Sequence, residues 1–95
     1  MKLRNVRLIH LRLAVDVAET GSMTIAAHVN NMAQATVSIN IRNLEDTLGF
    51  PLFERDMTHG ARRAITGVTD RGKPVIRHFR RVLETIEELE EGEKL

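Results

Sequence analysis

The 95-residue sequence has no cysteine, tryptophan or tyrosine, and it contains only three phenylalanines and two prolines. Without cysteine the chain cannot form a disulfide framework, a thiolate zinc site or a cysteine nucleophile, and this fits a reducing compartment. It also lacks any apolar run near the roughly 18 residues of a membrane-spanning helix, and its N-terminus alternates basic and apolar residues where a signal peptide would be uniformly apolar. We therefore expect a soluble, cytoplasmic domain with no membrane partner.

The sequence also has little of what enzymes and metal sites require. Its four histidines, at positions 10, 28, 59 and 78, have no spacing that would place two of them on one helical face beside a carboxylate. Ser22 and Ser38 lack a nearby base, and there is no glycine-rich loop to cradle a phosphate. We therefore expect no enzymatic activity, no metal ion and no cofactor.

The charges are unevenly distributed along the chain, although the formal net charge is only +1. Residues 1–83 hold 13 Lys and Arg against 7 Asp and Glu, whereas residues 84–95 hold one Lys against six Glu. The acidic end taken alone is more typical of a solvated helix face than of a binding site. The basic body favours a polyanion as the partner.

Apolar residues at steps of three and four predict helices over 8–20, 23–29 and about 34–48. Gly21 and Gly49 are typical left-handed stops after the first and third of these helices. The polar stretch 30–33 is just long enough for a tight corner between the second and third helices. Asn31 and Gln34 are expected to form a capping pair at the start of the third helix.

The second half of the chain changes character at Pro51. Extended runs over 52–55 and 62–68 around a glycine-containing loop predict a β-hairpin with a long tip. A long last helix follows, capped by Thr69 or Asp70 or beginning nearer Lys73, because proline at 74 is tolerated only in the first turn. Its wide apolar stripe is expected to pack on the first helix of its own domain and on a twin helix in a homodimer. The predicted dimerisation residues are Val75, Phe79, Val82, Leu83, Ile86 and Leu89.

Three stretches of sequence together carry a specific resemblance: VAETGSMTIAA over 17–27, TVSINIRNLEDTLGFPLFER over 36–55 and TDRG over 69–72. The chain resembles the N-terminal DNA-binding domain of LysR-type bacterial transcriptional regulators. The resemblance implies a mainly α fold, a winged helix-turn-helix of three helices plus a β-hairpin wing over 1–68, followed by a linker and dimerisation helix over 69–95. It further implies regulation of transcription, by a homodimer bound to an inverted-repeat site on double-stranded DNA. The larger effector-binding domain of the family is absent from this chain.

The chain departs from the family at three positions. Ala14 stands where an aromatic is usual, Asn30 where a leucine is usual, and Ile39 where the reading helix usually has an arginine. We expect the packing around Ala14 and Asn30 to differ from that of the family. Ile39 either contacts a thymine methyl group or turns back toward the second helix as extra core.

A helix that reads DNA buries one face and presents a polar face to the base edges. The amides of Gln34 and Asn40 suit bidentate contact with adenine. Together with Ser38 and Ile39 on the same helix, they form the predicted set of base contacts: Gln34, Ser38, Ile39 and Asn40. Positive side chains and hydroxyls near helix starts suit phosphates. The predicted phosphate contacts are Ser22, Thr24, Thr36, Arg42, Arg55, Arg62 and Arg63.

Two other functions fit parts of the same pattern. The amphipathic last helix is also typical of a helical protein–protein interaction module, which would bind its partner in a salt-insensitive way. A basic body is also typical of a nucleoid-type protein that binds duplex DNA with little sequence preference.

Overall fold

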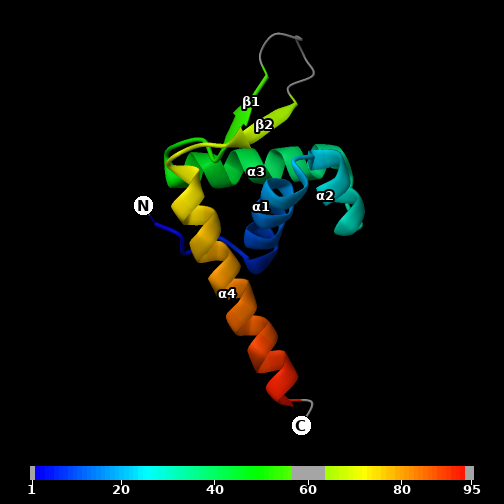
Figure 1. Ribbon diagram of the computed structural model, residues 1–95, viewed down its shortest axis with the longest axis vertical. Coiled ribbons are helices and arrows are strands. Elements are labelled where there is room, and N and C mark those ends of the chain that lie inside the picture. Colours follow the sequence, from blue (N-terminus) through cyan, green and yellow to red (C-terminus); the bar gives the residue numbers. More distant parts are fainter. Residues whose placement is uncertain (1, 57–63, 94–95) are drawn as a thin grey trace.

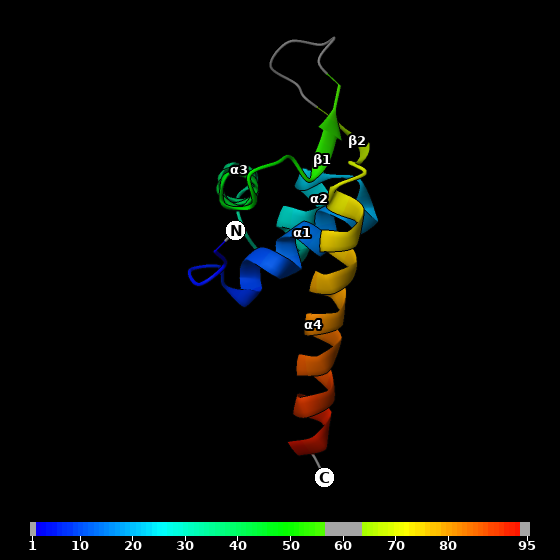
Figure 2. The ribbon, with the colours of Figure 1, turned by 90° about the vertical axis from the view of Figure 1, so that its left-hand side faces the viewer.

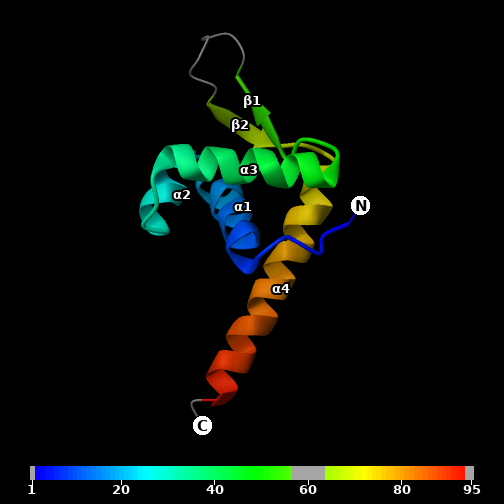
Figure 3. The ribbon, with the colours of Figure 1, turned by 180° about the vertical axis from the view of Figure 1, so that it is seen from behind.

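A computed structural model describes residues 2–56 and 64–93 as four helices and a two-stranded hairpin (Figure 1). The helices are α1 (Leu8–Thr20), α2 (Met23–Val29), α3 (Gln34–Leu48) and α4 (Gly72–Glu93), and the strands are β1 (Phe53–Arg55) and β2 (Ile65–Val68). Viewed from behind, α3 lies across the molecule between the hairpin and α1 (Figure 3). This is the winged helix-turn-helix arrangement with a long last helix that the sequence predicts.

The core lies where α1 meets the other three helices. Leu13 and Val17 of α1 are fully buried, as are Val37 and Ile41 of α3. Ala14, which stands where the family usually has an aromatic, is also fully buried, so this position remains part of the core with a small side chain. None of the helices within the described ranges is long and apolar enough to cross a bilayer.

The corner between α2 and α3 is built from backbone hydrogen bonds. The N–H groups of Asn31 and Met32 donate to the carbonyls of His28 and Ala27, at 3.1 and 2.9 Å. Asn31 adopts a left-handed conformation with φ +57°, which asparagine tolerates better than most residues. The predicted capping pair of Asn31 and Gln34 is wrong, because the N-cap of α3 is Ala33, which has no side-chain acceptor.

Asn30 joins α2 to α1 through polar contacts. Its Nδ2 donates to Asp16 Oδ2 and to the carbonyl of Ala26, both at 2.8 Å, and the residue is half-buried. The Asn30 side chain, which stands where the family usually has a leucine, therefore uses its amide N–H groups to bond both α1 and α2. This position contributes to the α1–α2 contact without adding to the apolar core.

Glu45 connects α3 to the wing. The residue is only 9% exposed. Its carboxylate Oε2 accepts from the N–H groups of Leu52 and Phe53 at 2.6 and 3.4 Å, and its Oε1 pairs with Arg55 at 3.0 Å. The strands β1 and β2 are antiparallel, with Phe53 opposite Val68 and an irregularity between Glu54 and Arg55. Glu45 therefore links α3 to the start of β1.

The start of α4 is tied to the same loop. Thr69 Oγ1 accepts from the N–H of Gly72 at 2.9 Å and donates to the carbonyl of Pro51 at 2.7 Å, so Thr69 is the cap, as expected. A Cβ at Gly72 would lie 2.6 Å from the carbonyl oxygen of Leu52, and only glycine permits this approach. The helix therefore leaves the wing in a fixed direction.

Along its length, α4 presents two adjacent apolar faces. Ile76 and Phe79 are buried in the core that α1 shares, and Arg80 Nε bonds Glu19 of α1 at 3.2 Å. Val82 and Leu89, on the second face, are 43% and 64% exposed. Figure 2 shows the C-terminal half of α4 extending beyond the three-helix body. The single stripe of the sequence is thus divided between an internal contact and an uncovered face.

Candidate nucleic-acid interface

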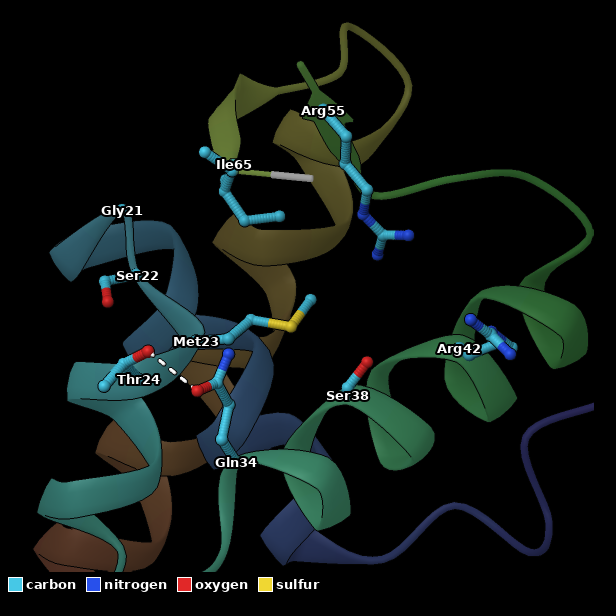
Figure 4. Close-up of a pocket in the computed structure, with 10 residues that line it drawn as sticks. Gly21, Ser22, Met23, Thr24, Gln34, Ser38, Arg42, Arg55 and Ile65 are labelled. Carbon is cyan, nitrogen blue, oxygen red and sulfur yellow. Dashed lines mark hydrogen bonds between the residues drawn. The ribbon is translucent and has the colours of Figure 1, made fainter. Parts of the chain in front are cut away.

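A concave surface lies between α2, α3 and the wing strands (Figure 4). It has a volume of about 790 Å³. Its lining residues are Gly21, Ser22, Met23, Thr24, Gln34, Ser38, Arg42, Arg55, Ala64 and Ile65. We call this surface the hollow. Of these lining residues two are arginines and none is acidic, so the hollow favours an anion.

Three residues of α3 form the floor of the hollow. Gln34, Ser38 and Arg42 follow one another at steps of four, which places them in a row along one side of the helix. The adjacent side of the helix, which includes Val37 and Ile41, is buried in the core. The helix is therefore held rigidly by one face while a row of hydrogen-bonding groups remains accessible on another.

The start of α2 forms one wall of the hollow. Ser22 Oγ accepts from the N–H of Ile25 at 3.1 Å and so caps this helix, as expected from the sequence. Thr24 Oγ1 donates to Oε1 of Gln34 at 3.0 Å, which links this wall to the floor (Figure 4). Met23, whose side chain also lines the hollow, was not singled out from the sequence, because nothing in its local pattern distinguishes it from an ordinary core methionine.

The two arginines of the hollow differ in how their charge is balanced. Arg42 is exposed on α3. Arg55 is held by Glu45, and its side chain is only 23% exposed. Arg42 therefore offers the more available positive charge, while Arg55 is already partly neutralised. Arg62 and Arg63, the other two predicted phosphate contacts of the wing, lie outside the described residues.

Three predicted contact residues of α3 lie away from the hollow. Ile39 is 58% exposed, so the alternative in which it turns back as extra core is wrong. Thr36 is also exposed. Asn40 is half-buried and follows Ser38 by two residues, about 200° around the helix. It therefore lies on the flank of α3 away from the hollow, and its base contact stays a prediction.

The predicted dimerisation residues separate into two groups. Phe79 is buried within its own domain, and Val75 and Leu83 pack half-buried against the same core. Ile86 is half-buried, and Val82 and Leu89 are exposed. The uncovered apolar face of α4 consists of Val82, Ile86 and Leu89. Its pairing with a second chain stays a prediction.

Comparisons with known proteins agree with this geometry. Residues 8–73 match the family model described as bacterial regulatory helix-turn-helix protein, lysR family. The chain is 40% identical over 81 residues to the uncharacterized HTH-type transcriptional regulator YvbU of Bacillus subtilis, in an alignment that covers 85% of the chain and 26% of YvbU. The chain thus spans about a quarter of the length of this relative.

Two solved structures are similar over nearly the whole chain. A full-length OxyR variant from Pseudomonas aeruginosa superposes with a TM-score of 0.81 at 28% identity, over 95% of this chain and 28% of OxyR. The DNA-binding domain of BenM, in a complex with benA site 1 DNA, superposes with a TM-score of 0.80 at 30% identity, over 94% and 93% of the two chains. The order and packing of the four helices and the hairpin are therefore those of known proteins.

Proposed function

The chain belongs to the LysR family of bacterial regulatory helix-turn-helix proteins, and from this premise we propose that it reads specific sites on duplex DNA as part of a transcriptional regulator. One observation carries the proposal. The side of α3 next to its buried face presents Gln34, Ser38 and Arg42 in a row to the hollow, none of whose lining residues is acidic. A helix fixed in this way can enter the major groove as a rigid unit.

Base reading is assigned to the exposed side of α3. Gln34 and Ser38 offer hydrogen bonds to base edges, and Ile39 offers an apolar surface suited to a thymine methyl group. Asn40, on the other flank, is proposed as a contact only at the edge of the groove. The DNA complex of the BenM domain supports this use of the fold.

Phosphate contacts are assigned to the rim of the same surface. We assign them to Ser22 and Arg42, with Arg55 as a weaker contributor because Glu45 already balances part of its charge. The set expected from the sequence also includes Thr24, Thr36, Arg62 and Arg63. Each neutralised phosphate releases counterions, so four or five contacts per protomer give a dimer a salt slope of about 7 to 9.

The uncovered face of α4 supports a homodimer. An apolar stripe that includes Val82 and Leu89, 43% and 64% exposed, is removed from water when it pairs with the same stripe of a second chain. A two-fold dimer presents two reading helices to one side of the duplex. The target is then an inverted repeat with half-sites one turn, or a whole number of turns, apart.

The test is a selection from randomised duplexes, followed by competition gel shifts at two salt concentrations with the selected duplex and a scrambled one. A regulator prefers the selected duplex and loses affinity steeply with salt. Equal binding of both duplexes would instead identify a nucleoid-type binder. Absence of duplex binding at low salt would refute the proposal and leave the protein–protein interaction module.

A further inference from the structure

We propose that Thr24 is a positioning residue that decides which base Gln34 reads, an inference that rests on the proposed function. Its hydroxyl holds the amide oxygen of Gln34, so that the amide nitrogen meets the DNA. Gln34 then reads guanine, and not the adenine that a free glutamine amide would suit.

The inference is based on a hydrogen bond between α2 and α3. Thr24 Oγ1, on α2, donates to Gln34 Oε1, on α3, at 3.0 Å. Figure 4 shows the amide oxygen of Gln34 turned toward Thr24 and the amide nitrogen turned away from it. Both residues are exposed and both line the hollow, so the bond lies at the surface where the DNA would be.

The bond changes what Thr24 itself can do. A threonine hydroxyl has a single hydrogen to donate. Because that hydrogen is directed at Gln34, the hydroxyl cannot at the same time donate to a phosphate oxygen. The phosphate contact expected of Thr24 from the sequence and its role toward Gln34 therefore exclude one another, and the observed geometry favours the second.

The bond also determines which groups Gln34 presents. A glutamine amide carries one oxygen acceptor and two N–H donors. Adenine offers an acceptor and a donor at its major-groove edge, and so requires both ends of the amide, whereas guanine offers two neighbouring acceptors, N7 and O6. With its oxygen engaged by Thr24, Gln34 presents donors, and two donors match guanine.

The rest of the helix makes Gln34 important for this preference. Ile39, exposed next to the row of polar residues, has no group to donate to guanine. Arg42 lies two turns further along the helix and is assigned to a phosphate. Near the N-terminus of α3, reading of guanine therefore depends on the amide that Thr24 orients.

The experiment compares binding-site selection by the full chain with selection by Thr24→Val and Thr24→Ser. Valine has nearly the shape of threonine but no hydroxyl, while serine keeps the hydroxyl. The wild type and Thr24→Ser should select guanine over adenine at one position of each half-site by on the order of tenfold. Thr24→Val should lose most of that preference, or select adenine, while the preferences at other positions stay unchanged.

Gln34→Ala identifies the position and separates positioning from a direct contact. This variant should remove the preference at the same base, and adding Thr24→Val to it should change the preference no further, because there is no amide left to orient. Thr24 is exposed, so the thermal midpoint of each variant should match that of the wild type, as circular dichroism will show.

Three outcomes would overturn the inference. If Thr24→Val weakens binding equally on all duplexes and keeps the guanine preference, Thr24 contacts a phosphate. If the wild type selects adenine at the position that Gln34→Ala identifies, the amide is not held as proposed. If the wild type selects no duplex, the proposed function itself fails, and the inference fails with it.

Discussion

Replacing Glu45 by alanine should destabilise the domain more than any other single change of an acidic residue in the described part of the chain. The carboxylate accepts from two backbone N–H groups and pairs with Arg55, and its side chain is only 10% exposed. Its loss would leave the N–H groups of Leu52 and Phe53 and a largely buried guanidinium without their acceptor. Breaking a buried pair in this way costs about 3–5 kcal/mol. Small domains have a total stability of about 5–15 kcal/mol, so this loss would remove a large fraction of the free energy of unfolding.

Urea denaturation followed by circular dichroism measures this destabilisation. Glu45→Gln keeps an oxygen acceptor but removes the charge, and should cost only about 1–2 kcal/mol. Asp46→Ala is the matched control, since it removes an exposed carboxylate one residue further along the same helix, and should stay within about 0.5 kcal/mol of the wild type. A decrease below about 1 kcal/mol for Glu45→Ala would show that the hydrogen bonds of this carboxylate contribute little net stability.

Three further predictions concern the proposed interface. Ile86→Asp places a charge on the uncovered face of α4 and should weaken both dimerisation, measured by sedimentation, and DNA affinity, measured by gel shift. If the variant still dimerises, the dimer interface lies elsewhere on the chain. Ile39→Arg should shift base preference toward guanine without changing the thermal midpoint, because residue 39 is 58% exposed, and an unchanged preference would exclude a groove role. Arg42→Ala should lower the salt slope by about 0.9 for each phosphate that is no longer neutralised, and an unchanged slope would show that Arg42 binds no phosphate.

The helices could be predicted from the sequence because their determinants are local. The apolar steps of α1 to α3 and the glycines after α1 and α3 define their bounds, and Gly21 and Gly49 indeed adopt left-handed conformations, with φ of +69° and +87°. The predicted start of α3 at Gln34 is also correct, whereas its predicted cap is wrong. The tight corner puts Asn31 into a left-handed turn and leaves Ala33 at the cap position, which residue preferences alone do not reveal.

The contacts between elements could not be predicted, because they depend on how helices approach one another in space. Thr24 and Gln34 are ten residues apart, as are Glu45 and Arg55, and neither pair has a spacing that marks it. Each residue of these pairs looks like an ordinary polar surface residue in the sequence. The division of the α4 stripe into two faces is equally hidden, since helical periodicity shows which residues share a side but not which of them α1 will cover.

The polar bridge between Asp16 and Asn30 constrains how this sequence can diverge. If residue 30 alone became leucine, the carboxylate of Asp16 would be left without its donor in a half-buried position, which is unfavourable. If residue 16 alone became apolar, the Asn30 amide would keep only the carbonyl of Ala26 as an acceptor. The two positions are therefore expected to change together across descendants of this chain, and grafting its α2 onto the α1 of a relative requires transferring both.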